Sequence, residues 1–242
     1  MIELQNISLG FSGKMLLKNA SCRFENSSLT ALIGRNGAGK SSLLYAMSSL
    51  SSLSDNYEGN ILIDGTNVKV MDAARRARSV AFVSTERIRI PNMHCRDLVA
   101  LGRAPYTNWT GRMQESDRKA VMNALDSVGM ADYADRTMDT MSDGECQRVM
   151  IARAIAQDTK NILLDEPTSF LDLPGRHEIC SLLGELAHSL GKCIVYSTHD
   201  LEVAVRKCDN VATVGPEALA FLPGDKTKAR EEIRRLFGID MQ

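Results

Sequence analysis

Eight consecutive residues of this chain have the types and order of a phosphate-binding loop, fitting the pattern G-x-x-x-x-G-K-[ST]. Glycine lets the backbone wrap so that successive amides face a phosphate, and the helix expected to follow adds the positive end of its dipole. The lysine would reach the β- and γ-phosphates, and the final hydroxyl would ligate Mg²⁺. The predicted nucleotide-binding residues are Gly34, Arg35, Asn36, Gly37, Ala38, Gly39, Lys40, Ser41 and the adjacent Ser42.

Two adjacent acids follow a second apolar segment. The run at residues 162–164 leads directly into Asp165 and Glu166. In a protein with such a phosphate loop, an aspartate at the end of a neighbouring strand is placed to hold Mg²⁺ or its waters. Glu166 is turned the other way and is a candidate for polarising the water that attacks the γ-phosphorus. A solvated turn is the alternative interpretation, and it is the weaker one beside the loop at 34–41.

Length and composition restrict the class of protein that carries these groups. The chain has 242 residues, of which 44% are apolar and 24% charged, with a formal net charge of -1. This is the size of one large domain or of one domain with a sizeable insertion, and the composition excludes a wholly disordered chain. The near-neutral charge argues against bulk nucleic-acid binding.

Cysteine usage and apolar runs give expectations about location. The six cysteines show no CxxC pair and no Cys/His cluster at metal-ligand spacing, so we expect reduced thiols in a cytosolic protein. The first residues lack a basic segment followed by an apolar stretch, so no signal peptide is expected. No apolar run approaches the ~18 residues of a transmembrane helix, and we expect any membrane role to come through a partner.

The apolar periodicity predicts the elements that position these residues. Strands are expected within 1–34 and at 61–63, 80–83, 162–164 and 193–196, and helices at about 40–50 and 231–237. From 87 to 160 the pattern changes to helix periodicity. We therefore predict a single α/β domain over residues 1–242, with its core at 1–86 and 161–242 and a helical subdomain at 87–160.

Further segments resemble the motifs of one family, the ATP-binding subunits of ABC transporters. Residues 141–148, MSDGECQR, are similar to the signature segment usually written LSGGQ, and STHD at 197–200 resembles the histidine switch. SFLD at 169–172 resembles the D-loop. LGRAPY at 101–106 and the run AIAQDTKNILLDEPTSFLD are similar to the branch that serves iron-siderophore, haem and vitamin B12 importers. The resemblance spans about residues 2–214.

The resemblance implies a P-loop NTPase core of the ABC ATPase type, with an antiparallel β subdomain and an α-helical insertion. It implies hydrolysis of ATP with Mg²⁺ by a head-to-tail homodimer, each ATP lying between the loop of one chain and the signature segment of the other. His199 would contact the γ-phosphate, and Asp172 would act across the dimer. The residues assigned in this way are Ser142, Gly144, Glu145 and Asp172 for ATP and Lys40, Glu166 and His199 for catalysis.

Several of these assignments have a structural alternative. Ser142 and Glu145 are also spaced as a capping box, which a helix start needs without any ligand. A histidine at the end of a strand is often structural when it is considered alone. Phe11 follows the first strand where the family carries an aromatic that stacks on adenine, and core packing is an equal alternative for it.

Two positions depart from the family pattern. Thr85 stands where the family usually has a glutamine that touches Mg²⁺, and its short side chain predicts a metal contact through water and weaker Mg²⁺ coupling. Asp143 replaces a glycine of the signature segment. A carboxylate near a γ-phosphate is unfavourable, so we expect Asp143 to point away or to reduce ATP affinity. Both departures favour a slow or tightly gated ATPase.

The resemblance also implies that this chain is a peripheral subunit at the cytoplasmic face of the inner (plasma) membrane. Its implied partners are polytopic permease subunits and an extracytoplasmic substrate-binding protein, with no nucleic acid. Apolar residues crowd the segment after Thr85, where they would form either a docking surface or local core. They are Ile88, Ile90, Pro91, Met93, Leu98, Val99, Leu101, Tyr106 and Trp109.

Two other functions stay open: a soluble ABC ATPase of iron–sulfur assembly and a slow nucleotide-gated regulator. The cargo is not specified, because its recognition would belong to other subunits.

Overall fold

A six-stranded sheet forms the centre of the computed structural model, which describes residues 1–49, 57–86, 90–107 and 112–239. Its strand order is β10-β9-β3-β8-β7-β6, and all neighbouring pairs are parallel except the hairpin β9–β10. The strands are β3 (Ser28–Gly34), β6 (Val80–Val83), β7 (Asn161–Leu164), β8 (Cys193–Thr198), β9 (Asn210–Gly215) and β10 (Ala218–Pro223).

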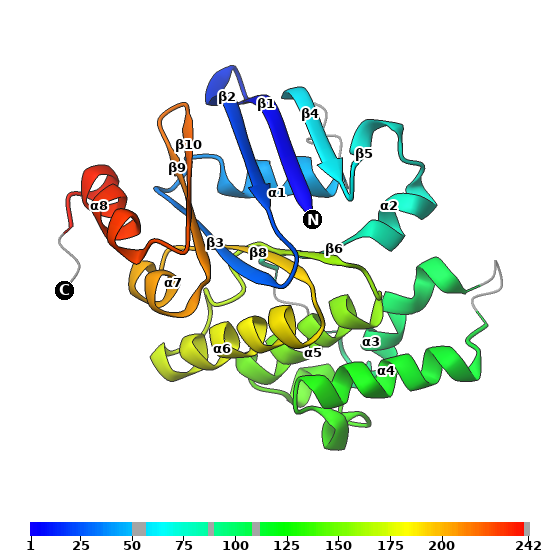
Figure 1. Ribbon diagram of the computed structural model, residues 1–242. Helices are drawn as coiled ribbons and strands as arrows, with labels where there is room; N and C mark the ends of the chain where they lie inside the picture. Colours follow the sequence, from blue (N-terminus) through cyan, green and yellow to red (C-terminus); the bar gives the residue numbers. More distant parts are fainter. Residues whose placement is uncertain (50–56, 87–89, 108–111, 240–242) are drawn as a thin grey trace.

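A smaller antiparallel sheet covers one face of the central sheet (Figure 1). Its order is β2-β1-β4-β5, built from β1 (Ile2–Phe11), β2 (Lys14–Phe24), β4 (Tyr57–Ile63) and β5 (Thr66–Asn67). Helix α1 (Lys40–Ser48) packs into the same core. A single turn at Val68–Val70 and helix α2 (Ala73–Ser79) then lead into β6.

Helices cover the opposite face of the central sheet (Figure 1). Between β6 and β7 the described residues form helices and turns, with α5 packed against α3, α4 and β6. The helices are α3 (Cys95–Ala100), α4 (Glu115–Ser127), α5 (Asp143–Ala156), α6 (Leu173–Ser189), α7 (Leu201–Lys207) and α8 (Lys226–Phe237), and the short 3-10 turns are Leu101–Tyr106, Ala131–Tyr133 and Met138–Thr140. The predicted fold class, an α/β P-loop core with an antiparallel sheet and a helical insertion, is confirmed.

The continuous apolar runs in the sequence are explained by burial on both faces of the parallel strands. Ile162 and Leu164 of β7 point into the core beneath the helices, while Leu163 points into the core beneath the small sheet. The ends of such strands are held at fixed positions, so residues that follow them share one rigid edge.

Some predicted boundaries were displaced. Helix α1 ends at Ser48, because Ser49 takes the left-handed conformation with φ 52. Helix α8 begins at Lys226, five residues before the predicted start, where Asp225 caps it by accepting from the Lys228 amide at 2.9 Å. Strand β8 extends to Thr198. Among the described residues, no helix has the length and apolar character needed to cross a bilayer.

The apolar segment after Thr85 divides between core and surface. Leu98 and Val99 are 1% and 0% exposed, so of the two alternatives, docking surface and local core, they belong to the core. Helix periodicity directs these positions of α3 inward, where the helix packs against α5 and α4. Ile88 and Trp109 lie outside the described residues.

A buried ion pair fixes the helical insertion. Arg103 Nε lies 3.0 Å from Asp117 Oδ1 with both side chains almost fully buried, and Arg103 Nη1 donates to the Ala156 carbonyl at 2.8 Å. The Gln114 amide and then Arg103 hold the pKa of Asp117 below its ordinary value. The stabilisation from this carboxylate is therefore present at neutral pH and is lost as pH falls through its lowered pKa.

We expect Arg103→Ala to destabilise the fold by about 3 kcal/mol, because it leaves a buried carboxylate unpaired. For a chain of this size that lowers the melting temperature by about 6–12 °C. The control is Arg96→Ala, which removes a pair with Asp135 whose side chains are 51% and 75% exposed; its expected cost is at most about 1 kcal/mol. Equal losses in the two variants would contradict the structural role assigned to Arg103.

Candidate active site

The glycine-rich loop joins β3 to α1, and contacts on both sides require glycine. A Cβ on Gly34 would lie 2.5 Å from the Val214 carbonyl oxygen of the adjacent strand. Gly39, the residue before α1, has φ 105, and a Cβ there would lie 3.0 Å from Leu16 Cβ. These constraints keep the loop close to β9 and β2 at the start of α1.

Lys40 lies within this loop. Its side chain is buried, and Nζ donates to the Gly34 carbonyl at 2.9 Å and to the Arg35 carbonyl at 3.4 Å. Burial lowers the pKa of the Lys40 ammonium, while the carboxylates of Glu166 and Asp165 act in the opposite direction. The lysine ammonium therefore binds carbonyl groups of the loop that contains it. A phosphate in the loop would give the ammonium negatively charged oxygen acceptors in place of these carbonyls.

Asp165 joins three elements at the carboxyl end of β7. Its Oδ1 accepts hydrogen bonds from Ser41 Oγ at 2.9 Å and from Ser197 Oγ at 2.6 Å, and its amide donates to the Val83 carbonyl at 2.8 Å. The hydroxyl and carboxylate oxygens that converge here are the donors that Mg²⁺ prefers. Ser41 and Asp165 therefore fit a magnesium ion, as the sequence predicts.

Glu166 and His199 form a pair at the adjacent position. Glu166 Oε1 and His199 Nε2 are in direct contact, and their side chains are 24% and 44% exposed. The Glu166 amide donates to Ser197 Oγ at 2.8 Å, and its φ of 48 lies in the left-handed region that non-glycine residues rarely adopt. Such conformations are found where the surrounding structure imposes them, often at active sites. The structure thus brings the two catalytic candidates together.

The predicted signature segment starts α5. Ser142 Oγ accepts from the Glu145 amide at 3.3 Å, and the Ser142 amide donates to Glu145 Oε2 at 2.8 Å, so the capping box is confirmed. Ser142 Oγ also donates to the same Oε2 at 2.9 Å. The Ser142 amide is the main cause that lowers the pKa of Glu145, and the nearby guanidinium of Arg136 adds to it.

The D-loop residue Asp172 is the cap of α6. Its Oδ1 accepts from the Gly175 amide at 3.0 Å. Arg176, which the sequence did not single out, donates from Nε to the Leu171 carbonyl at 2.9 Å, and its Nη1 lies 3.6 Å from Asp200 Oδ2. This arginine links the segment before α6 to the residue that follows His199.

Two further candidates have different surroundings. Phe11 lies at the end of β1 and is 44% exposed, so core packing does not explain it, and adenine stacking stays a prediction. Thr85 Oγ1 donates to the Asp165 carbonyl at 3.0 Å. This hydrogen bond directs the Thr85 hydroxyl to the backbone beside the predicted metal position. Its contact with Mg²⁺ also stays a prediction.

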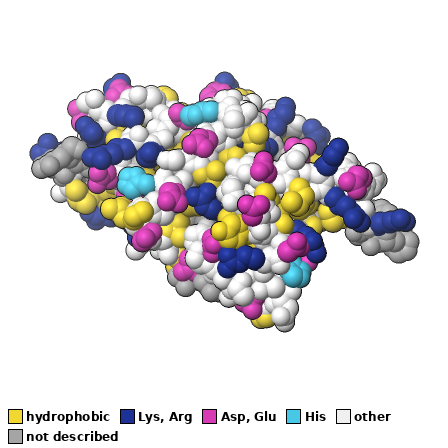
Figure 2. Space-filling view, turned by 90° about the horizontal axis from the view of Figure 1, so that it is seen from below, with side chains coloured by type: hydrophobic (Ala, Val, Ile, Leu, Met, Phe, Trp, Pro, Cys, Tyr) yellow, Lys and Arg dark blue, Asp and Glu magenta, His cyan; other side chains and the backbone are white. Residues whose placement is uncertain are grey.

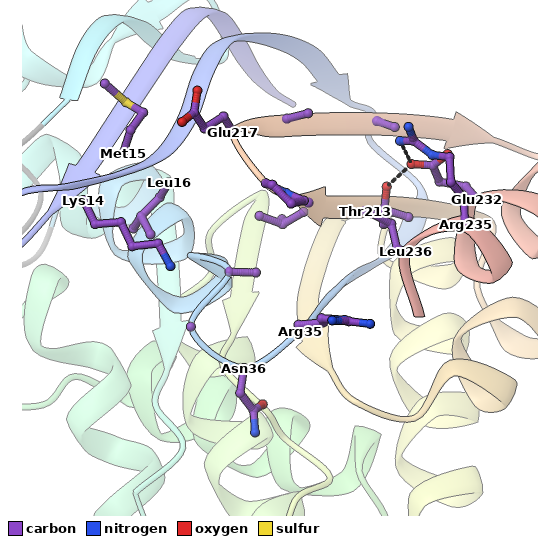
Figure 3. Close-up of a pocket in the computed structure, with 17 residues that line it drawn as sticks. Lys14, Met15, Leu16, Arg35, Asn36, Thr213, Glu217, Glu232, Arg235 and Leu236 are labelled. Atoms are coloured by element: carbon purple, nitrogen blue, oxygen red, sulfur yellow. Dashed lines mark hydrogen bonds and ion pairs between the residues drawn. The ribbon is translucent and has the colours of Figure 1, made fainter. Parts of the chain in front are cut away.

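A cavity of about 750 Å³ adjoins the glycine-rich loop (Figure 3). Residues 35–38 form one wall, the start of β2 and the β9–β10 turn form others, and α8 contributes Glu232, Arg235 and Leu236. Glu232 accepts two hydrogen bonds from Arg235, at 2.9 and 2.6 Å. The sequence did not identify α8 as a neighbour of the loop, because this contact arises only through the β9–β10 hairpin.

The predicted residues that follow β3, β7 and β8 therefore meet at one edge of the sheet, where the loop, the oxygen donors and the Glu166–His199 pair are adjacent. This arrangement defines a P-loop nucleoside triphosphatase. More narrowly, the chain belongs to the ABC transporter family, whose sequence profile matches residues 17–169, and it is an ATPase of that family.

Known proteins of similar sequence agree with this membership. An achromobactin transport ATP-binding protein of Dickeya dadantii is 34% identical over 241 residues, covering 99% of this chain and 88% of that protein. A petrobactin import ATP-binding protein of Bacillus subtilis is 38% identical over 204 residues, covering 84% and 79%. A dimeric ATP-binding cassette solved with ADP and Pi superimposes with a TM-score of 0.75 at 26% identity, covering 93% of this chain and 100% of that one.

Ser197 was missed as a functional residue, although it opens the STHD segment. Its hydroxyl oxygen accepts a hydrogen bond from the Glu166 amide, and the same hydroxyl donates one to the Asp165 carboxylate, so Ser197 positions both acids. We expect Ser197→Ala to lower kcat for ATP hydrolysis about ten- to a hundredfold, since it removes the acceptor of the Glu166 amide and one of the two hydroxyl groups that hold Asp165, while KM for ATP changes little. Ser197→Thr keeps the hydroxyl and should retain most of the activity. An unchanged kcat in the alanine variant would contradict the positioning role.

Proposed function

We propose that this chain is the ATP-hydrolysing subunit of a membrane importer and that it works as a homodimer at the cytoplasmic face of the membrane. The observation that carries the proposal is the convergence of Lys40, the Ser41–Asp165 pair and the Glu166–His199 pair at one sheet edge. Relatives named for siderophore transport and for cobalamin import support iron-siderophore or cobalamin-type cargo, and haem stays a prediction. Polytopic permease subunits and a substrate-binding protein are the proposed partners.

In the proposed reaction the loop amides and Lys40 bind the β- and γ-phosphates of ATP. Ser41 and Asp165 would hold Mg²⁺, and the chemistry that this ion would supply is neutralisation of the phosphate charge. Glu166 accepts a proton from the attacking water, and His199, already in contact with this carboxylate, orients the water and the γ-phosphate. The Ser197 hydroxyl keeps Asp165 and Glu166 at their positions during this step.

Ser142, Gly144, Glu145 and Asp172 act on the nucleotide of the partner in this proposal. Gly144 supports it, because none of the described residues lies close enough to require a glycine there. A Cβ on Gly144 would meet only Leu171 Cδ2, at the ordinary contact distance of 3.9 Å. The absence of a side chain at this position would then serve the close approach of the partner chain or its nucleotide to the start of α5.

Part of the apolar segment after Thr85 supports permease docking. Ile90 is 38% exposed and Leu101 is 54% exposed, and Pro91 is also exposed. They flank α3 on the helical insertion. An exposed apolar set of this kind suits a helix from a partner protein.

The central test is Glu166→Gln. We expect it to reduce steady-state ATP hydrolysis at least about a hundredfold, because the general base is lost, and to accumulate an ATP-bound dimer on size-exclusion chromatography. Lys40→Ala should abolish the ATP-dependent dimer instead. The control Glu185→Gln, an exposed position on α6, should leave both properties unchanged.

Three outcomes would contradict the proposal in different ways. Full turnover in Glu166→Gln would remove this residue from catalysis. No turnover in the wild type, even with its permease, would favour the nucleotide-gated regulator. If a pull-down with this chain recovered iron–sulfur assembly proteins in place of a polytopic membrane protein, the result would favour the soluble alternative.

A second prediction concerns the partner-facing glycine. In the Glu166→Gln background, we expect Gly144→Ala to weaken the ATP-dependent dimer at least about tenfold, since the added methyl group meets the partner's nucleotide or loop. Stability of the isolated chain should not fall, because alanine is the better helix former. Gly184→Ala is a matched control: it lies in α6, with its nearest added contact also at 3.9 Å. Equal dimerisation in the two variants would contradict the proposed role of Gly144.

A further inference from the structure

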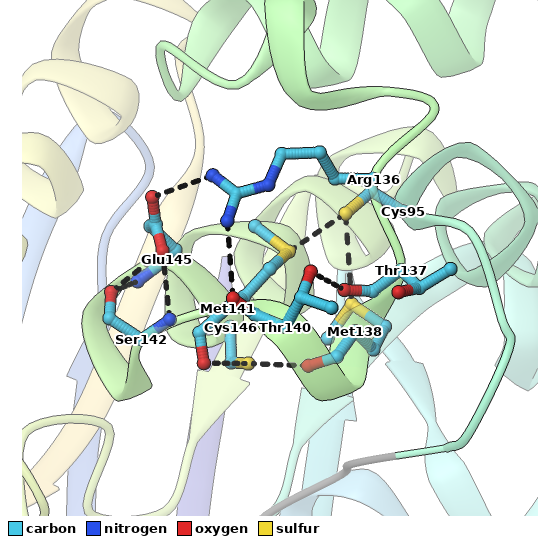
Figure 4. Close-up of polar contacts among 9 residues, drawn as sticks. All are labelled: Cys95, Arg136, Thr137, Met138, Thr140, Met141, Ser142, Glu145 and Cys146. Carbon is cyan, nitrogen blue, oxygen red and sulfur yellow. Dashed lines mark hydrogen bonds and ion pairs between the residues drawn. The ribbon is translucent and has the colours of Figure 1, made fainter.

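Three sulfur atoms meet in the core directly behind the signature segment. Cys95 Sγ, at the start of α3, lies 2.9 Å from Met141 Sδ and 3.9 Å from Met138 Sδ. The exposed fractions of the three residues are 0% for Cys95, 0% for Met138 and 3% for Met141. In Figure 4 both contacts converge on the thiol of Cys95. These residues play no part in the proposed ATP hydrolysis.

The backbone holds this cluster together without help from the sulfur atoms. The Cys95 amide donates to the Arg136 carbonyl at 2.9 Å, and the Met138 amide donates to the Met93 carbonyl at 2.9 Å. Cys146 lies against the other side of the same turn, with Sγ 3.6 Å from the Met138 carbonyl oxygen. The segment that carries both thioethers is therefore preorganised against α3.

We propose that Cys95, Met138 and Met141 form a binding site for one soft monovalent cation, Cu(I) or the chemically similar Ag(I). Thioether sulfur does not bind hard cations such as Mg²⁺ or Ca²⁺, whereas a set of thiolate and thioether ligands selects Cu(I). The site supplies one thiol and two thioethers from two chain segments. It lacks the oxygen donors that characterise the Ser41–Asp165 position.

Charge balance favours a monovalent ion over a divalent one. The fully buried Cys95 thiol and the two buried thioethers carry no charge before binding. When the cation binds, the S–H bond breaks, a metal–sulfur bond forms and the proton leaves to solvent. A cation of charge +1 with one thiolate and two neutral thioethers leaves the site neutral again. A divalent ion would leave a net positive charge in the core, which is costly.

One of the two sulfur–sulfur distances suits a small three-coordinate ion, and the other requires a side-chain rotation. With a metal–sulfur distance of about 2.3 Å, the sulfur atoms of a trigonal site lie about 4 Å apart. The separation of 3.9 Å between Cys95 Sγ and Met138 Sδ already matches this value. The 2.9 Å separation from Met141 Sδ must open by about 1 Å, which a rotation of the unbranched methionine side chain can provide.

The test is anaerobic titration of the full chain with Cu(I) in competition with a strong Cu(I) chelator, which suppresses binding by isolated thiols. We expect the wild type to bind one Cu(I), with about three sulfur neighbours in X-ray absorption spectra. The double variant Met138→Leu and Met141→Leu conserves volume, so it should keep the fold while its affinity falls at least about a hundredfold. Cys95→Ala should lose the site.

Two matched controls use residues of equal burial. Met150→Leu changes a methionine of the same core that is 3% exposed, and Cys180→Ala removes a thiol that is 1% exposed and contacts Tyr196. Both should bind Cu(I) like the wild type. Wild-type affinity in the double methionine variant, or equal binding by Cys95→Ala and Cys180→Ala, would overturn the proposal. The titration contains no nucleotide, so its outcome is independent of the proposed ATPase mechanism.

Discussion

The position of Asp165 is the constraint on which the active site depends. Its carboxylate accepts from Ser41 of α1 and Ser197 of β8, its amide donates to Val83 of β6, and its carbonyl accepts from Thr85. One residue at the end of β7 thus fixes the glycine-rich loop, the next strand and the connection to the helical insertion. Among the described residues, the hydrogen bonds to its carboxylate come from two hydroxyl groups, and the Lys40 ammonium interacts with its charge through space. A site of this composition is suited to receive a cation between the serine and the aspartate.

The remaining charges of the site are arranged so that the loop keeps its shape before nucleotide binds. Lys40 is held by the carbonyls of Gly34 and Arg35, which satisfy its buried ammonium group. Glu166 is held in a left-handed conformation by its amide contact with Ser197, and its carboxylate contacts His199. Groups already oriented in this way need little reorganisation when charge develops during phosphoryl transfer.

The sequence predicted the parts of this site that depend on local patterns. A glycine-rich turn between an apolar run and a helix, and two acids after another apolar run, locate residues 34–41, Asp165 and Glu166, because parallel strands end at the same edge of a sheet. Ser197, Arg136 and Arg176 were not found, since their partners lie 31, 9 and 24 residues away respectively and only the tertiary fold selects them. The sequence also left open whether Leu98 and Val99 lie in the core or on a docking surface, because an apolar segment does not itself reveal which of its faces packs inward.

The signature segment gives a physical reason to predict slow turnover in the proposed dimer. Glu145 is ionised, because the Ser142 amide lowers its pKa, and this carboxylate engages both the amide and the hydroxyl of Ser142. A γ-phosphate from the partner would compete with an anion already bound at the start of α5. Arg136 offsets part of that charge, since Nη1 lies 3.6 Å from Glu145 Oε1 while Nη2 donates to the Thr140 carbonyl at 3.1 Å. Closing the dimer therefore requires the Ser142 hydroxyl to exchange one anionic acceptor for another, and this exchange favours tight gating of the ATPase.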